Sequence, residues 1–283
     1  MRWLLGVTLV VAVACGKRAD DKPAPPPPPA AVQRVISLTP SATEVVAALG
    51  STAVLVGVDE FSEYPPEVKA LPKVGSFTTP NLEEIVRLKP TLVIVDDIHA
   101  NAAGALHDAG ITTVECKMHT LPDVKAALRT IGARIGKTAE AEVVVTRIEA
   151  AVEAATAKRP ARRPRVMLII DREAGGLGNL IAAGTGTYID ELLAVVGGEN
   201  VLAGAGVKYP KISMEEVLRA QPEVILDMSY AGRGEKGLDP WRAAEVPAVK
   251  NGRVMLLADA FLIAPSPRVD AALAVLAKAI SPP

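Results

Sequence analysis

The chain carries one pattern of residues twice, in two distant parts of the sequence. Residues 81–95 read NLEEIVRLKPTLVIV, and residues 213–227 read SMEEVLRAQPEVILD. Each copy has a residue that can cap a helix, a short amphipathic stretch, a proline that ends it and an apolar run too short for a helix. A repeated helix–turn–strand unit at this separation predicts two similar lobes rather than a solenoid of short repeats. We expect the function in the cleft between them.

Length and composition fit two ordinary globular lobes. The 283 residues correspond to two domains at about 150 residues each. Hydrophobic residues make up 49% and charged residues 22%, which is enough apolar material for normal cores. The net charge of -1 gives no reason to expect nucleic-acid binding. Aromatic residues are only 3% of the chain, so the positions of its three phenylalanines are informative.

The N-terminus reads as an export signal. Arg2 precedes an apolar run over residues 3–14, which is shorter than the ~20 residues of a membrane span and predicts a signal peptide at 1–14. Residues 12–15 (AVAC) resemble a bacterial lipobox, in which Cys15 is lipidated; a plain signal peptide with an incidental cysteine is the alternative. Residues 15–33 then form a proline-rich tether, which holds the folded body away from a membrane. The lipid is the only membrane contact that we expect.

From residue 34 onward, short apolar runs alternate with helical patterns. This alternation predicts an α/β fold with mostly parallel sheets. We expect an N-terminal α/β lobe at 34–122, a helical linker at 123–160 and a C-terminal α/β lobe at 161–283. The linker contains a helix over 138–158, about 30 Å long. Ser41 and Glu44 have the spacing of a capping box that opens the first helix.

Signatures of catalysis are absent from the sequence. The glycines at 175–178 and 184–186 lack the spacing of a dinucleotide loop, and the histidines lack the spacing of a metal site. We therefore expect no catalytic residues, no metal site and no cofactor apart from a bound ligand, with Cys116 as a small buried side chain. Two other classes stay open: an exported enzyme that uses Asp171 or Asp227 as an acid, and a surface adhesin without a cleft.

Several longer motifs give the chain a family resemblance. It resembles the ABC-transporter periplasmic substrate-binding proteins for vitamin B12, ferric siderophores and haem, and is most similar to the cobalamin-binding members. The motifs are RVISLTPSATE (34–44), FSEYPP (61–66), NLEEIVRLKP (81–90), GGEN (197–200) and SPR (266–268). The resemblance covers residues 34–280. It implies two Rossmann-like lobes bridged by a single long helix, the class III architecture, with one ligand held between the lobes.

The resemblance also implies which residues contact the ligand. Phe77 stands where the cobalamin binder has a tryptophan, and Ala260 stands where it has another. The disulfide of that protein's second lobe is missing here. The expected ligand-binding residues are Phe61, Phe77, Tyr209, Asp259, Ala260 and Phe261. Aromatic rings suit a flat and largely apolar macrocycle, and Asp259 would accept hydrogen bonds from its amide groups.

Cobalamin or a related corrinoid is thus the expected ligand, and two other metal chelates stay open. A ferric siderophore would need cationic partners, for which Arg172, Lys208 and Arg233 in loops are available. Haem would need an axial ligand, which His99 or Tyr230 could supply.

The duplicated unit suggests a route of delivery. If Asn81 and Ser213 cap their helices, Glu84 and Glu216 can fold back onto the caps, and the glutamates one position earlier project outward. In the family that this chain resembles, the matching glutamates dock onto the membrane permease. That resemblance implies that Glu83 and Glu215 contact an ABC importer, which consists of a permease and an ATPase. We expect a monomer that is a membrane-anchored lipoprotein of the periplasm or cell envelope.

Overall fold

The computed structural model describes residues 33–234 and 236–281 of the chain. The predicted signal peptide, Cys15 and the predicted tether up to residue 32 lie outside the described residues. Within the described ranges, no helix combines the length and the apolar character that crossing a membrane requires.

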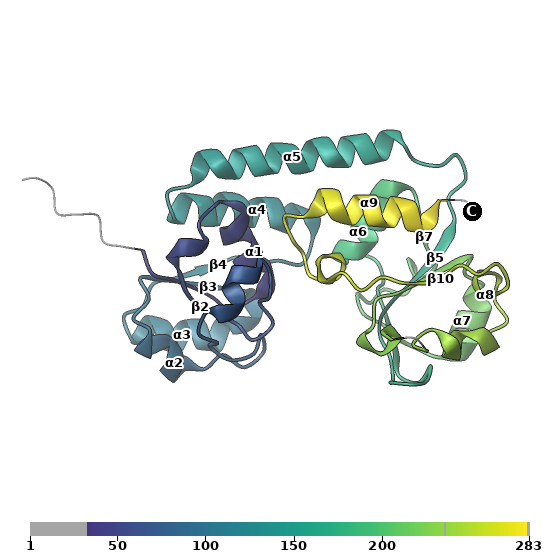
Figure 1. Ribbon diagram of the computed structural model, residues 1–283, viewed down its shortest axis with the longest axis horizontal. Helices are drawn as coiled ribbons and strands as arrows, with labels where there is room; N and C mark the ends of the chain where they lie inside the picture. The colour runs from purple at the N-terminus through teal and green to yellow at the C-terminus, as the bar shows by residue number, and fades with distance from the viewer. Residues whose placement is uncertain (1–32, 235, 282–283) are drawn as a thin grey trace, which may run out of the picture. The chain divides into compact units, whose positions relative to one another are not determined.

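The first half of the described chain forms a parallel four-stranded sheet in the order β2-β1-β3-β4 (Figure 1). Its strands are β1 (Val35–Ser37), β2 (Leu55–Val58), β3 (Leu92–Val95) and β4 (Thr113–Glu115), and its helices are α1 (Pro40–Ala48), α2 (Leu82–Arg87) and α3 (Ala100–Asp108). The chain leaves β1 for one neighbour and later returns to β3 on the other side. Ligands of open α/β sheets bind at such a switch point, beyond the carboxyl ends of the strands.

The second half forms a mixed sheet in the order β10-β9-β5-β6-β8, with β7 paired to β5. Strands β9 and β10 run parallel to β5, whereas β6 runs antiparallel to β5 and β8 runs antiparallel to β6. The strands are β5 (Arg165–Asp171), β6 (Leu180–Ala182), β7 (Glu199–Asn200), β8 (Lys211–Ile212), β9 (Val224–Asp227) and β10 (Val254–Leu256). The helices are α6 (Tyr188–Val196), α7 (Met214–Ala220), α8 (Pro247–Lys250) and α9 (Val269–Ile280).

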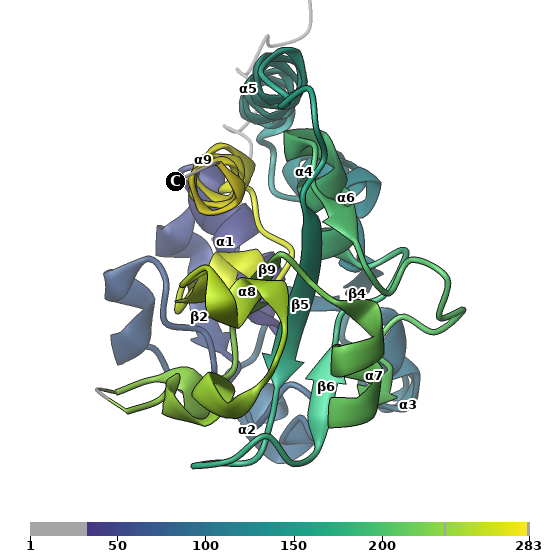
Figure 2. The same ribbon diagram turned by 90° about the vertical axis from the view of Figure 1, so that its right-hand side faces the viewer.

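Two helices connect the halves. These are α4 (Leu121–Arg134) and α5 (Thr138–Ala157). The 20 residues of α5 span about 30 Å, and the helix packs on α4 at one end and on α9 and α6 at the other (Figures 1 and 2). The predicted architecture of two α/β lobes bridged by one long helix is therefore confirmed.

Both copies of the duplicated unit fold as predicted, with one difference between them. Asn81 and Ser213 cap α2 and α7 through their side chains, and each helix leads into a buried strand. Glu216 folds back onto its cap, because its Oε2 accepts the Ser213 amide at 2.8 Å. The same prediction is wrong for Glu84, which pairs with Arg87. The Asn81 amide is not available to Glu84, since it donates to the Val74 carbonyl at 2.8 Å.

The predicted capping box at Ser41 is also wrong. Helix α1 begins earlier, because Thr39 accepts the Ala42 amide at 3.1 Å and Pro40 occupies the first turn. Proline suits that position, where its missing N–H costs nothing. Glu44 consequently lies inside the helix, with only 8% of its surface exposed.

Candidate functional site

A cavity of about 490 Å³ lies where the carboxyl ends of strands from both sheets face one another. Residues that follow β1, β3 and β4 form one wall, and residues from the end of β5, from α6 and from later loops form the other. The cavity thus sits at the switch point of the first sheet, where α/β folds bind ligands. Its volume is within the usual range of small-molecule sites, about 300–1,000 Å³.

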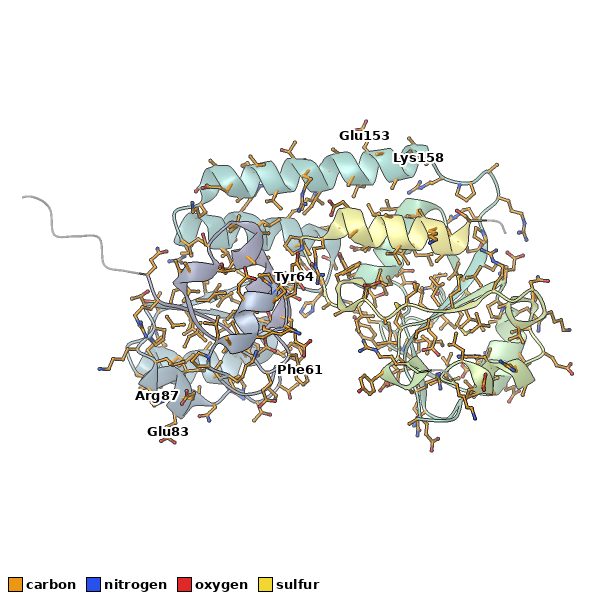
Figure 3. All side chains as sticks on the ribbon, in the orientation of Figure 1. Phe61, Tyr64, Glu83, Arg87, Glu153 and Lys158 are labelled. Carbon is orange, nitrogen blue, oxygen red and sulfur yellow. The ribbon has the colours of Figure 1, made fainter. Side chains whose placement is uncertain are left out.

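Three exposed aromatic rings line this cavity. Phe61, Phe77 and Tyr209 keep 62%, 36% and 51% of their surface exposed, although the chain has few aromatic residues. Figure 3 shows Phe61 on the side of the first lobe that faces the second. Exposed apolar surface that gathers in one place marks a binding site more often than scattered apolar residues do. The arrangement suits a flat apolar ligand, and the role of these rings in binding remains a prediction.

The three other expected ligand contacts lie elsewhere. Asp259, Ala260 and Phe261 are not among the residues that line the cavity; the lining comes instead from Ile263, which follows them, and from its neighbours. Phe261 is buried, and its ring centroid lies 4.6 Å from Cζ of Arg268. The loop that follows the 3-10 turn at Ala260–Leu262 thus reaches the cavity through its later residues, whereas the turn places Phe261 in the core.

A histidine that the sequence did not single out lies in the cavity wall. His119 lines the cavity, and its Nε2 lies 3.0 Å from Asp97 Oδ1 and 3.3 Å from Asp96 Oδ1. One donor atom from each of these three residues fits within 4.8 Å, a spacing that could hold a metal ion. The signal was missed because the aspartates and the histidine are 22 residues apart or more and follow different strands.

The pKa values of the two carboxyl groups of this cluster are shifted in opposite directions, one by burial and the other by hydrogen bonds. Asp96 is 4% exposed, and desolvation raises its pKa to about 6. Hydrogen bonds from Asp96 and His119 lower the pKa of the more exposed Asp97. Below a pH of about 6 the cluster therefore holds one proton, on Asp96, the side chain that is shielded from water.

Replacing Asp96 with asparagine should change how stability depends on pH. Asp96 has a folded-state pKa above its value of 3.8 in the unfolded chain, so the folded state binds the extra proton. The contribution of this proton to folding stability is complete below about pH 3.8 and is lost as the pH rises through about 6. The free energy of unfolding of D96N, relative to that of wild type, should therefore increase by about 1–3 kcal/mol between about pH 4 and pH 7.5. Urea unfolding at both pH values measures this difference, and a constant difference would contradict it.

His99 is a structural residue and not a free metal ligand. It is buried, its Nδ1 accepts the Asp96 amide at 2.9 Å, and its Nε2 donates to the Phe77 carbonyl at 2.7 Å. The Phe77 ring meets the imidazole edge-on, with centroids 6.0 Å apart. Both ring nitrogens are thus occupied, so the suggested axial role of His99 is not supported. The histidine instead fixes the segment that carries Phe77.

The cations and acids suggested for other roles do not reach the cavity either. Arg172 and Asp227 form an ion pair at 2.8 Å with both side chains fully buried, and Trp241 donates to the same carboxylate. Arg233 stacks on Tyr230 at 5.1 Å, and neither lines the cavity. Asp227 is therefore shielded from solvent, which removes one of the two acids considered for an enzyme.

Lys208 is likewise absent from the cavity lining. Asp171 is exposed, and its carboxylate accepts the amide of the next residue. Cys116 is buried as expected, and burial is the main cause that raises its pKa to about 12, so its thiol is not a nucleophile at neutral pH.

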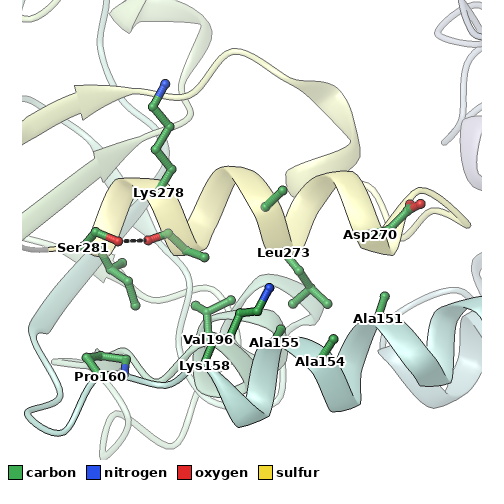
Figure 4. A pocket seen from close by; sticks show the side chains of 13 residues that line it. Ala151, Ala154, Ala155, Lys158, Pro160, Val196, Asp270, Leu273, Lys278 and Ser281 are labelled. Carbon is green, nitrogen blue, oxygen red and sulfur yellow. Dashed lines mark hydrogen bonds between the residues drawn. The ribbon is translucent and has the colours of Figure 1, made fainter.

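Another cavity, of about 530 Å³, lies between α5 and α9 (Figure 4). Its floor is built largely from alanine side chains, and Lys158 and Lys278 are among the residues around it. It has no aromatic side chain and lies within the helical layer, away from the strand ends. Its lining offers no converging polar groups that would orient a ligand.

Comparison with known proteins gives consistent matches. Residues 35–260 match the family of periplasmic binding proteins. The vitamin B12-binding protein of Vibrio cholerae is 29% identical over 242 residues, which cover 83% of this chain and 84% of that protein. Among solved structures, the periplasmic heme-binding protein RhuT from Roseiflexus sp. RS-1 has a TM-score of 0.76 and 30% identity, covering 88% of this chain and 97% of that one. The vitamin B12-binding protein BtuF of Vibrio cholerae has a TM-score of 0.73 and 28% identity, covering 88% and 96%.

Proposed function

Because the chain belongs to the periplasmic binding protein family, we propose that it is the solute receptor of an ABC importer and captures cobalamin or a related corrinoid between its lobes. It is a binding protein of the periplasm and not an enzyme, and its fold is the class III fold of its structural neighbours. The observation that supports a flat apolar ligand is the set of three exposed rings around one cavity, which are Phe61, Phe77 and Tyr209. The vitamin B12-binding relatives favour a corrinoid.

One observation favours haem as the second candidate. His119 lines the cavity, and its Nε2 is engaged by the two aspartates, whereas no described residue hydrogen-bonds to its Nδ1. A carboxylate that holds one imidazole nitrogen orients the other for metal ligation. The heme-binding neighbour is consistent with this alternative.

Binding measurements with both chromophores should separate the two candidates. Cyanocobalamin is expected to bind with a Kd of about 1 μM or below, measured by calorimetry, and H119A should leave that affinity within about threefold, since imidazole ligation is not required. If haem is the ligand, haemin should bind with a shifted Soret band, and H119A should abolish the shift. His107 is exposed on α3, so H107A is the matched control. Binding of neither compound would remove both candidates and leave a ferric siderophore.

We further propose that the receptor docks on its permease through the duplicated helices. Glu83 and Glu215 are exposed, and neither forms an ion pair with another described residue. Three residues later, Val86 and Leu218 keep 46% and 41% of their surface exposed. Each lobe thus presents a carboxylate beside an apolar side chain. The two helices lie on the side of the lobes opposite α5 (Figures 1 and 2), and Glu83 projects from the end of its lobe (Figure 3).

The remaining features of the proposal are the domain bounds, the monomeric state and the way the protein is held in the cell envelope. We propose lobes at 34–122 and 161–283, a linker at 123–160, and a monomer held at the membrane by a lipid on Cys15 after removal of residues 1–14. The proline-rich segment after Cys15 supports this arrangement, since such segments act as semi-rigid spacers. Labelling of cells with a radioactive fatty acid should mark the wild-type protein and not C15S.

A further inference from the structure

One ion pair joins the two lobes directly. Glu44 on α1 accepts Arg268 Nε at 2.8 Å and also accepts Arg268 Nη2, so the pair is bidentate. Ser266 Oγ donates to the same carboxylate. Among the described residues, no other salt bridge connects 34–122 with 161–283. The contact is also well shielded, since the side chains of Arg268 and Glu44 are 24% and 9% exposed.

Aromatic rings from both lobes hold the same guanidinium. The Cζ atom of Arg268 lies 3.9 Å from the ring centroid of Tyr64 and 4.6 Å from that of Phe261. Figure 3 shows Tyr64 beside the junction of the lobes. Cation–π contacts strengthen when the cation is removed from water, and a bidentate pair fixes direction as well as distance. Together these contacts restrict Arg268 to one position relative to both lobes.

The ion pair is linked to the cavity through the backbone. Ile263, Ala264 and Pro265 line the cavity and directly precede Ser266. Ser266 is buried; its Oγ accepts the Arg268 amide at 3.1 Å, and its carbonyl accepts the Tyr188 hydroxyl at 3.3 Å. Phe261 packs at the other end of the same loop. The loop that forms part of the cavity wall is thus anchored at both ends to Arg268.

We propose that Glu44 and Arg268 form an interlobe lock that sets the separation of the lobes, and so the width of the cavity, before a ligand arrives. Arg268 is then a positioning residue: it does not line the cavity, but it fixes the loop and the lobe that do. If the cavity already has the width that the ligand needs, less conformational entropy is lost when the ligand binds. The inference about ligand binding depends on the proposed receptor function, whereas the inference about lobe separation does not.

The sharpest test removes both charges together. R268A alone would leave the Glu44 carboxylate buried and unpaired, and the protein could fail to fold. The double variant E44Q/R268M keeps side chains of similar size and leaves neither charge buried without its partner, which is the main cost of breaking a buried ion pair. The matched control is R129M/E142Q. Arg129 and Glu142 form a bidentate pair at 2.8 and 3.0 Å between α4 and α5, but this pair is exposed and does not join the lobes.

Two measurements on the full-length chain report the lock. Spin labels, introduced as non-natural amino acids at the exposed positions Arg87 on α2 and Arg219 on α7, give the interlobe distance distribution by pulsed EPR. We expect a narrow distribution for wild type and R129M/E142Q, and a broader or longer one for E44Q/R268M at an unchanged circular dichroism spectrum. Release of bound cyanocobalamin or haemin by stopped flow should be at least about tenfold faster in E44Q/R268M.

The outcomes separate this inference from the proposed function. If neither compound binds the wild-type protein, the proposed ligand fails, and the EPR distances still test the lock. An unchanged distance distribution in E44Q/R268M would overturn the lock. Equal broadening in R129M/E142Q would overturn it as well, because the effect would not depend on a contact between the lobes. An unchanged release rate alongside a broadened distribution would overturn the link between the lock and the cavity.

Discussion

The triple variant F61A/F77A/Y209A is expected to bind its ligand about a thousandfold more weakly than wild type, with each single variant weaker by about tenfold. A ring that keeps about half of its surface exposed in the free protein offers a flat ligand apolar contact worth about 1.5 kcal/mol. The rings are 62%, 36% and 51% exposed in the free protein, so their removal should cost little folding energy. Calorimetric titration measures the affinity, and thermal unfolding checks the fold.

Tyr230 provides the matched control for this prediction. It is an aromatic side chain with 80% of its surface exposed, and it does not line the cavity. Y230A should therefore bind the ligand as wild type does. A triple variant with wild-type affinity would show that the ligand is bound elsewhere. Equal losses in Y230A and in the single variants would show that the effect is not specific to the cavity.

The parts of the fold that the sequence predicted are those with a strong local signal. The strand at Leu92–Val95 is the uninterrupted apolar run of the first copy of the duplicated unit, and the helix at Tyr188–Val196 has clear helical periodicity between recognisable ends. The duplicated unit was predicted for the same reason. In contrast, β6 and β8 have three and two residues, and the region around them reads as loop. Such short strands exist because a neighbouring strand pairs with them, and that pairing leaves no periodicity in the sequence.

The errors at the site come from contacts between distant residues. Ser41 and Glu44 have capping-box spacing, but Thr39 and Pro40 carry an equally valid start signal, and the partner of Glu44 lies 224 residues away. The cluster of His119 with Asp96 forms only in the folded sheet, where the end of β4 lies beside the end of β3. Aromatic scarcity was the most useful signal, since Phe61 and Phe77 do line one cavity. The same reasoning also put Phe261 at the cleft, but its ring is buried in the core, where an aromatic side chain packs equally well.

The double variant E83A/E215A is expected to lose ligand uptake into cells while its ligand affinity stays at the wild-type value. Both carboxylates are exposed and neither lines the cavity, so their removal should not alter the bound state. Loss of one partner of a buried charge pair costs about 2–5 kcal/mol at an interface, and the two losses would reduce docking by several orders of magnitude. Uptake of labelled ligand in a strain that lacks the native receptor measures the effect, and single variants should give intermediate rates.

A charge-matched control separates docking from a general effect of net charge. Glu153 on α5 and Glu245 are also exposed, one on the linker and one on the second lobe, and Figure 3 shows Glu153 on the side opposite Glu83. E153A/E245A removes the same two charges and should transport as wild type does. Extending the test, V86S/L218S should reduce uptake by about tenfold, since each exposed apolar side chain contributes about 1 kcal/mol or less at a packed contact. Wild-type uptake by E83A/E215A would show that the permease recognises another surface, and equal losses in E153A/E245A would assign the effect to charge alone.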